Sequence, residues 1–343
     1  MTADSISFTP TPDQYGFTFG GLEPVLTINP GTVLTLWCED AYGGRIRSTA
    51  DLASASLTTN DLNPQTGPFW ISGAEPGDVV AVHIVDLTPA RSWGVSTLIP
   101  YFGGLTSTPQ NASLHPPLPE RTWIYEYDGT NHTVGFAAQA SDFTVALPAN
   151  MMLGTVGVAP AQREVRTSLV PDYFGGNMDT PEMRAGATAY LRANVEGALL
   201  SFGDGHYRQG EGESCGTAVE GAMNATIIVD LIKSDDVSES PAWPRLENDT
   251  HLMTVGSGRP LEGAWKASQV DMINWLAQLH RLDPLDAYQL LSQISEAPLA
   301  NVVDTNYSCV TKIDKRLLPS APVFGGVHAD LVARSAALGS ITY

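Results

Sequence analysis

The segment Gly31–Cys38 reads GTVLTLWC, and its β-branched and large apolar residues are the clearest sign of the fold. Val25–Ile28 (VLTI) and Asp78–Val85 (DVVAVHIV) have the same composition, and turn residues such as Asn29-Pro30 separate these runs. Residues of these types favour strands, while Pro, Gly and Asn favour turns. We therefore predict a mainly β protein with a β-sandwich (jelly-roll-like) core.

The C-terminal part is expected to add helices to this core. Apolar residues recur at helical spacing within Trp265–Leu282, and Asp283 predicts the start of a second helix at Leu285–Ile294. The prediction is thus a mainly β fold with α+β additions and a smaller helix-containing C-terminal part. We expect one unit over residues 1–343; the alternative is a subdivision near residues 150–180 into an N-terminal β-sandwich and a C-terminal α+β part.

The segment Arg91–Pro148 has many prolines and weak periodicity, so we expect mainly loops there. Short strands are predicted within it and further along the chain. They lie at Thr122–Tyr127, Asp142–Leu147, Thr188–Ala193, Ala222–Ile232 and Ala300–Thr311.

Composition excludes some classes of partner. The 343 residues carry a formal net charge of −19, which opposes binding to nucleic acid and to anionic membranes. A small neutral or cationic substrate fits better, although a halophilic surface would give the same charge. We predict a cytoplasmic protein, because the three cysteines are widely spaced and the N-terminus has no signal-peptide pattern. No apolar run approaches the roughly 20 residues that span a bilayer.

A functional site is predicted in Gly203–Glu220, which reads GDGHYRQGEGESCGTAVE. Residues two apart on an extended segment face the same way, so Asp204 and His206 can bind one metal ion. An isolated Asp-x-His is more often a turn with a hydrogen-bonded histidine. The surrounding glycines and the acids Glu213 and Glu220 favour the site, since carboxylates bind metals and act as general bases.

Two other segments are candidates for the same site. Asp40 ends a strand just before a glycine turn, where it could be a metal ligand or simply start the turn. Gly175 and Gly176 precede Asn177 and Asp179, so backbone amides and the Asn177 side chain could bind an oxyanion. A surface turn would look the same.

Cys215 is a weaker candidate. A catalytic thiol needs a positive environment, yet the segment around Cys215 is acidic apart from Arg208. We therefore expect no cysteine nucleophile. His83 is more typical of a structural histidine, and we keep it only because its strand could pair near Asp40.

These segments, in this order, resemble the acetamidase/formamidase family. The segments that carry the resemblance are Gly31–Gly44, Asn63–Val79 (NPQTGPFWISGAEPGDV), Gly175–Asp179, Gly203–His206, Gly216–Glu220 and, more loosely, Asp304–Pro319. The resemblance spans most of the chain and implies a β-sandwich-centred fold, a divalent metal (zinc or calcium), hydrolysis of a short-chain amide, and self-association into a homo-oligomer.

The resemblance maps family motifs onto Asp40, Asn177, Asp179, Asp204, His206 and Glu220, and the roles given to the site residues are our own expectations. The metal ligands are Asp40, Asp204 and His206; the general base is Glu220, with Glu213 as second choice. Other catalytic and substrate-binding residues are Asn177, Asp179, Gly175, Gly176 and Tyr207.

The chain also departs from the family pattern. Tyr15–Gly21 replaces a histidine-bearing segment, Phe174 stands where other members have His, and Tyr207 stands where a small residue is usual. A bulkier pocket would follow, which argues against formamide itself as the substrate. Hydrolysis of a related C–N bond, in a cyclic amide or carbamate, is one alternative. A non-catalytic, metal-stabilised binding module is the other alternative.

Overall fold

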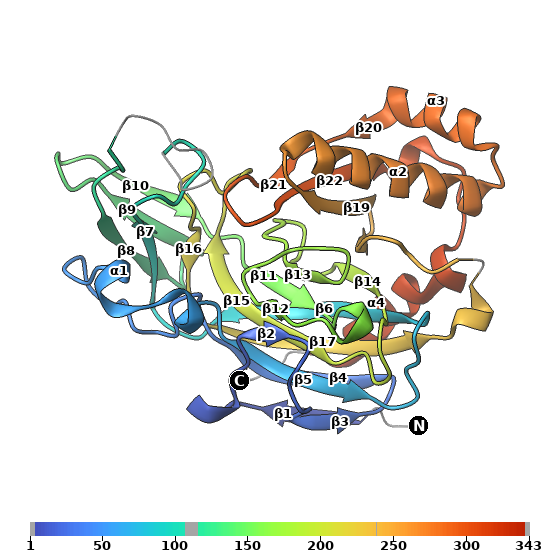
Figure 1. Ribbon diagram of the computed structural model, residues 1–343, viewed down its shortest axis with the longest axis horizontal. Coiled ribbons are helices and arrows are strands. Elements are labelled where there is room, and N and C mark those ends of the chain that lie inside the picture. The colour runs from blue at the N-terminus through green and yellow to red at the C-terminus, as the bar shows by residue number, and fades with distance from the viewer. Residues whose placement is uncertain (1–3, 107–115, 238, 340–343) are drawn as a thin grey trace.

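The computed structural model describes residues 4–106, 116–237 and 239–339. Two large mixed sheets dominate it (Figure 1). The first has ten strands in the order β1-β4-β17-β6-β14-β18-β19-β22-β20, with β21 also on β22. Its β1–β4 pair is parallel. The strands are β1 Ser5–Phe8, β4 Thr32–Cys38, β6 Val79–Pro89, β14 Thr188–Arg192, β17 Met223–Ile232, β18 Arg245–Glu247, β19 His251–Gly258, β20 Ser295–Glu296, β21 Leu299–Asn301 and β22 Tyr307–Asp314.

The second sheet, also ten-stranded, has the order β10-β9-β8-β7-β16-β15-β11-β13, and β5 pairs with both β15 and β3. A separate pair joins β2 to β12. These strands are β2 Thr18–Phe19, β3 Leu26–Ile28, β5 Gln65–Ile71, β7 Trp93–Leu98, β8 Arg121–Asp128, β9 Thr133–Ala137, β10 Thr144–Pro148, β11 Met152–Gly157, β12 Arg166–Thr167, β13 Gly175–Asn177, β15 Leu200–Arg208 and β16 Val219–Glu220.

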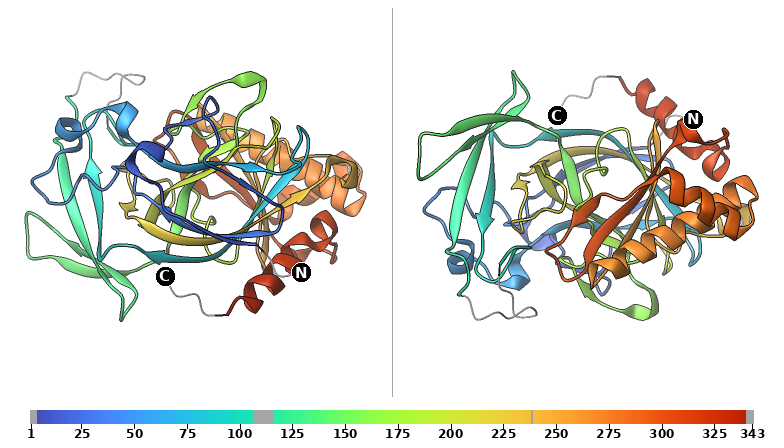
Figure 2. Two further views of the ribbon diagram at one scale, coloured as in Figure 1. Left: turned by 90° about the horizontal axis from the view of Figure 1, so that it is seen from below. Right: turned by 90° about the horizontal axis from the view of Figure 1, so that it is seen from above.

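The helices are few, and among the described residues the three longer than one turn follow residue 260. Asp283 caps α3 as expected, because its side chain accepts a hydrogen bond from the backbone N–H of Leu285 at 2.9 Å. Figure 2 shows α2 and α3 running side by side over the strands of the C-terminal part. No helix in the described part of the chain is long and apolar enough to cross a membrane. The helices are α1 Ala53–Ser56, α2 Leu261–His280, α3 Pro284–Ile294 and α4 Val327–Ala337.

One apolar cluster contains side chains from both large sheets. Leu34 and Ile227 come from the first sheet, and Leu153 and Phe202 from the second. A second cluster lies under the C-terminal helices and includes Leu276 of α2. Burial of such side chains is the main force that holds the elements together. The mainly β class with helical additions is confirmed; the jelly-roll arrangement and the subdivision near residues 150–180 stay predictions.

The segment 91–148 contains more strands than expected. The short strands predicted at residues 122–127 and 142–147 correspond to β8 and β10, but β7 and β9 join them at one end of the second sheet (Figure 1). The loop prediction was wrong at β7 and β9. β9 is largely half-buried, so it needs no long apolar run, and Gly94 and Ser96 interrupt the apolar residues of the mostly buried β7. Residues 107–115 lie outside the described residues.

Candidate active site and metal centre

The predicted site is built on the neighbouring strands β15, β16 and β11. Asp204 and His206 belong to β15, and Glu220 of β16 lies directly opposite His206 in the antiparallel ladder. On the other side, β11 pairs with β15 so that Leu153 faces Gly205. The functional side chains therefore come together by strand register, on a rigid part of the sheet.

Gly154 of β11 makes room for the site. A Cβ atom at this position would lie 2.4 Å from Asp204 Oδ2, 2.5 Å from Asp179 Oδ1 and 2.9 Å from His206 Cε1. These separations are shorter than real Cβ contacts. Three chemically active side chains thus converge on a place that any side chain at Gly154 would fill.

Four buried ligand atoms at this place have no hydrogen-bond partner. Within the described residues, these atoms are Asp179 Oδ1, Asp204 Oδ1, His206 Nε2 and Glu220 Oε2. His206 Nε2 lies 3.3 Å from Asp204 Oδ1 and 3.2 Å from Glu220 Oε2. Buried polar atoms without partners are costly and rare in folded proteins. A bound cation would satisfy the three that belong to one group, Asp204 Oδ1, His206 Nε2 and Glu220 Oε2.

The donor set fits a divalent metal ion. Two groups of three candidate ligands, Asp204–His206–Glu220 and Asp179–His206–Glu213, each place their ligand atoms within 4.8 Å of one another. All five of these side chains are buried. Imidazole nitrogen and carboxylate oxygen are the ligands that zinc uses in catalytic sites, whereas calcium takes oxygen ligands.

The pKa values of the site also favour a bound cation. Burial raises the pKa of Glu220 to about 7 and that of Glu213 well above its usual value. Burial alone would lower the pKa of His206, but the carboxylates of Glu220 and Asp204 hold it well above its ordinary value. Without a metal, protons must therefore neutralise this acidic group. A divalent cation can replace those protons.

Comparison with known proteins places this arrangement in a family. The profile of the Acetamidase/Formamidase family matches residues 19–168 and 133–313. The chain belongs to the acetamidase/formamidase family. It is thus an enzyme of a family that acts on amides, as the resemblance implied.

Solved structures and a sequence relative agree with this membership. The crystal structure of acetamidase from Yersinia enterocolitica is 39% identical, covers 93% of this chain and 94% of its own, and has a TM-score of 0.86. The acetamidase structure from Bacillus halodurans is 27% identical, covers 91% and 98%, and has a TM-score of 0.79. The acetamidase of Mycolicibacterium smegmatis is 27% identical over 60% of this chain and 63% of its own length.

Asn177 of this acetamidase/formamidase family member holds the acids in place. Its Nδ2 donates to Asp179 Oδ2 at 3.0 Å and to Asp304 Oδ2 at 2.8 Å. Its Oδ1 accepts from Asn63 Nδ2 at 2.7 Å and from the hydroxyl of Thr155. Both amide hydrogens of Asn177 are therefore engaged by carboxylates, and this arrangement leaves none for an oxyanion.

The glycine pair before Asn177 lies in β13, against β11. The backbone N–H of Gly175 donates to the carbonyl oxygen of Asp172 at 2.9 Å. Cβ atoms at Gly175 and Gly176 would lie 2.4 Å from the carbonyl oxygens of Val156 and Val170. The pair therefore allows close packing of backbones beside the site.

Asp40 lies apart from both candidate ligand groups. Its Oδ1 accepts from the backbone N–H of Tyr42 at 2.8 Å and of Gly44 at 3.1 Å, and its Oδ2 accepts from Arg91 Nη1 at 2.6 Å. This is the turn-starting role that was the alternative for Asp40. The segment still supports the site, because the carbonyl oxygen of Glu39 accepts from the backbone N–H of Asp204 at 3.1 Å.

Tyr207 points to the opposite face of β15 from its neighbour His206. Its hydroxyl lies 2.9 Å from the carbonyl oxygen of Arg91 and 3.0 Å from that of Ala222. Its ring packs over Gly221, where a Cβ would come within 2.5 Å of the ring. The structure therefore places Tyr207 in the packing of the sheet, away from the ligand atoms.

Cys215 lies in the same loop as Glu213 but has other partners. Its Sγ is 3.2 Å from the carbonyl oxygen of Thr217 and 4.0 Å from Ser96 Oγ. Neither partner is a base or a cation. These contacts favour the structural interpretation of this thiol.

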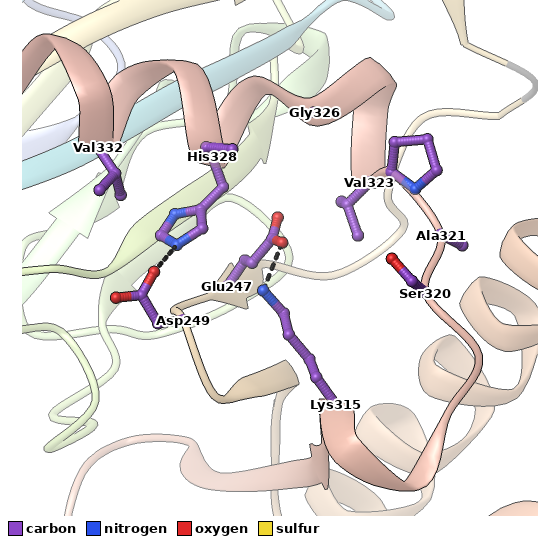
Figure 3. Close-up of a pocket in the computed structure, with 11 residues that line it drawn as sticks. Glu247, Asp249, Lys315, Ser320, Ala321, Val323, Gly326, His328 and Val332 are labelled. Carbon is purple, nitrogen blue, oxygen red and sulfur yellow. Dashed lines mark hydrogen bonds and ion pairs between the residues drawn. The ribbon is translucent and has the colours of Figure 1, made fainter.

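His83 belongs to a separate polar chain in the first sheet. Its Nδ1 is 2.9 Å from Thr188 Oγ1, which is 2.8 Å from His328 Nδ1; His328 Nε2 is in turn 3.4 Å from Asp249 Oδ1. His328 and Asp249 line a hollow of about 430 Å³, in which Lys315 pairs with Glu247 (Figure 3). None of the predicted ligands lines this hollow.

Several residues of the site were missed from the sequence. All but Gln209 lie far from Gly203–Glu220 in the chain, and only strand register and loop packing bring them to it. Asn63 and Asp304 each begin a segment that carries the family resemblance. That resemblance is the one signal that could have found these two residues. The missed residues are Asn63, Gly154, Thr155, Gln209, Asn301 and Asp304.

Proposed function

We propose that this chain hydrolyses a short-chain carboxylic amide at the Asp204–His206–Glu220 group and releases ammonia and a carboxylate. The proposal is carried by the partnerless atoms of Asp204, His206 and Glu220, which lie in one group, and by Asp179 Oδ1, which lies beside the Asp204 carboxylate at Gly154. We assign them as ligands of one divalent ion: His206 Nε2, Asp204 Oδ1, Glu220 Oε2 and Asp179 Oδ1. The imidazole in this set favours zinc over calcium.

When bound, the ion supplies Lewis-acid polarisation of the amide carbonyl and lowers the pKa of water beside it. Asp204 and Glu220 are committed to the ion in this scheme; the second oxygen of Glu220 accepts from the backbone N–H of Ala218 at 2.8 Å. Glu213 belongs to the second candidate group, Asp179–His206–Glu213, but neither of its carboxylate oxygens is among the buried atoms without a partner. Glu213 is therefore the better general base, and Glu220 the second choice, which reverses the order expected from the sequence.

In the reaction, Glu213 takes a proton from the attacking water as the water oxygen bonds to the carbonyl carbon. The C–N bond then breaks, and Glu213 returns the proton to the departing nitrogen, which leaves as ammonia. Asn177 and Asp304 hold Asp179 in place rather than binding the oxyanion. Burial of the group excludes bulk water and strengthens these interactions.

The first experiment measures ammonia release from a panel of formamide, acetamide, a cyclic amide and a carbamate. The enzyme is assayed as purified, after chelation, and after zinc or calcium is restored. We expect release from the linear amides that is lost on chelation and returns with zinc. Release that survives complete removal of metal would overturn the metal-dependent mechanism, and release only from the cyclic amide or carbamate would change the scissile bond.

Matched amide variants separate base from ligand. Glu213→Gln should lower kcat by roughly 100-fold or more, the size of a general-base contribution, and keep the metal content of the wild type. Glu220→Gln should lose metal as well as activity. Glu211→Gln, on the same loop and outside both candidate groups, is the control and should stay active. The opposite pattern would return the base to Glu220.

Self-association and a cytoplasmic location, both expected from the sequence analysis, remain parts of this proposal. Light scattering on the purified chain measures the first. A mass equal to one chain of 36.6 kDa would reject the homo-oligomer.

A further inference from the structure

Gln209 contacts the ring of His206. It directly follows β15 and is buried, with 8% of the residue exposed. Its Oε1 lies 3.0 Å from His206 Nδ1. Its Nε2 donates to the carbonyl oxygens of Asp179 at 2.5 Å and Ala300 at 3.0 Å.

These partners fix which way the amide of Gln209 faces. A side-chain amide nitrogen carries two hydrogens and accepts none, and a carbonyl oxygen only accepts. Exchanging Oε1 and Nε2 would place Oε1 against the carbonyl oxygens of Asp179 and Ala300, without a hydrogen between them. Chemistry therefore requires that Oε1 faces His206.

The orientation of this amide determines the tautomer of His206. Because Oε1 of Gln209 can only accept, Nδ1 of His206 must carry a hydrogen. In the neutral ring the other nitrogen, Nε2, then has a free lone pair. This is the nitrogen that has no partner and lies between Asp204 Oδ1 and Glu220 Oε2.

The same amide also holds a second candidate ligand. Asp179 has a φ of 46°, which is uncommon for a residue other than glycine. Its backbone N–H donates to the carbonyl oxygen of Gly154 at 3.0 Å, and its own carbonyl accepts from Gln209. The backbone of Asp179 is thus held from both sides, with its side chain directed into the site.

We propose that Gln209 is a positioning residue: its single amide holds His206 with Nε2 free for a cation and keeps Asp179 turned toward the same place. This inference rests on the proposed function for its metal. Gln209 acts through its two neighbours and has no place in the ligand set itself. Groups that orient a metal-bound histidine in this way typically change metal affinity by 10- to 100-fold when removed.

Two variants of Gln209 separate its two tasks. Gln209→Met has a similar length and loses both tasks, whereas Gln209→Glu keeps an acceptor for His206 Nδ1 and loses the donors to Asp179 and Ala300. The matched control is Gln269→Met, which removes a half-buried side-chain amide of α2 that donates to Thr311 of β22. Zinc affinity by competition, nitrogen-15 NMR of labelled histidine and kcat/KM are the readouts, with circular dichroism to verify folding.

We expect Gln209→Met to bind zinc about 10- to 100-fold more weakly, to lose the hydrogen-bonded Nδ1–H signal of His206 and to lower kcat/KM. Gln209→Glu should keep the Nδ1–H signal, and Gln269→Met should match the wild type in all three readouts. Unchanged zinc affinity together with an unchanged Nδ1–H signal in folded Gln209→Met would overturn the proposal.

The wild type provides a test that needs no variant. If His206 carries no hydrogen on Nδ1, the inference fails even if both Gln209 variants do not fold. If the wild type binds no zinc and releases no ammonia, the proposed function fails, and comparison of the hydrogen-bonded Nδ1–H signal of His206 in metal-free wild type and metal-free Gln209→Met still decides whether Gln209 orients the ring. If the wild type is an active zinc enzyme and Gln209→Met equals it, the inference about Gln209 alone is wrong.

Discussion

His206 and His83 are both buried histidines on long strands, one in each large sheet, and they differ in what faces their rings. His206 Nε2 has no hydrogen-bond partner and lies against two carboxylates. His83 Nδ1 is bonded to the hydroxyl of Thr188. The carboxylates raise the pKa of His206, whereas burial, with His328 nearby, lowers that of His83 to about 4.

The difference shows which observation identifies a site in this fold. Burial is common to both histidines, so it does not distinguish them. Partnerless polar atoms that converge from several strands do, because a folded protein tolerates them only where a ligand or ion completes them. Each prediction below tests this distinction at one position.

The largest effect should come from exchanging the two histidines for asparagine in turn. His206→Asn should lower kcat/KM by more than the roughly 100-fold typical of residues that only support a metal, and bound zinc should be lost. His83→Asn should leave kcat/KM within a few-fold and reduce the free energy of unfolding by about 1–3 kcal/mol, the cost of disturbing a buried hydrogen bond.

Steady-state kinetics, metal analysis and urea unfolding on the same preparations measure these outcomes. Two results would break the comparison. One is an active, metal-containing His206→Asn enzyme; the other is a folded His83→Asn protein that has lost turnover.

The next effect concerns Gly154. Gly154→Ala should abolish zinc binding and most activity, because its Cβ would lie 2.4 Å from Asp204 Oδ2 and 2.5 Å from Asp179 Oδ1. Overpacking of this kind costs about 1–3 kcal/mol. Gly135→Ala is the control, since its Cβ would meet only the carbonyl oxygen of Glu126 at 3.8 Å. Zinc content and kcat/KM of both variants test this prediction. Equal values for the two variants would show that no ion or substrate needs the place beside Gly154.

Much of the β architecture could be predicted from the sequence, and the failures have a common cause. Gly31–Cys38 was recognised because β-branched and apolar residues fill a strand that is buried along most of its length. β9 was missed because it is largely half-buried and its alternation is weak. β7 is mostly buried, and it was missed because Gly94 and Ser96 interrupt its apolar residues. Helix α4 was not expected either, and nothing in the sequence analysis pointed to it.

The site could be predicted only where its residues share one stretch of chain. Asp204, His206, Glu213 and Glu220 lie within Gly203–Glu220, so composition revealed them. Gly154 could not be found, because its contribution is the absence of a side chain at a strand register that the sequence does not show.

Asp40 is the reverse case: the sequence suggested a metal ligand, and the structure pairs this acid with an arginine. The sequence shows the carboxylate of Asp40. It does not show the ion pair with Arg91, because Arg91 is 51 residues away in the chain. Pairings between distant segments are set by the tertiary fold, and local patterns carry no record of them.

A smaller effect is expected in the pH dependence of stability. The pKa of His83 is near 6.5 in the unfolded chain and about 4 in the fold, so between these values the unfolded state binds more protons. Stability due to His83 is therefore present at neutral pH and is lost as the pH falls from 6.5 toward 4, by at most about 3 kcal/mol. His328, Asp249 and Arg334 are the charged or titratable groups that influence it.

The raised pKa of His206 gives the opposite sign in the metal-free protein, where its contribution is present at low pH and is lost as the pH rises through the folded value. Urea unfolding of metal-free wild type and His83→Gln at pH 7, 6 and 5 measures the first effect. The wild type should lose more stability than the variant over this range. Parallel losses would mean that His83 is not held neutral by the fold.

The smallest effect should be that of Cys215→Ser, although Cys215 lies two residues from Glu213. Its thiol has backbone and hydroxyl neighbours, as His83 has, and none of the partnerless atoms contacts it. We expect kcat/KM within about threefold of the wild type, because a thiol with such neighbours behaves as a small packing group. Kinetics on linear amides, with and without a thiol-blocking reagent, measure this. A complete loss of turnover with full zinc content would make Cys215 the nucleophile and would place the chemistry outside the group of partnerless atoms.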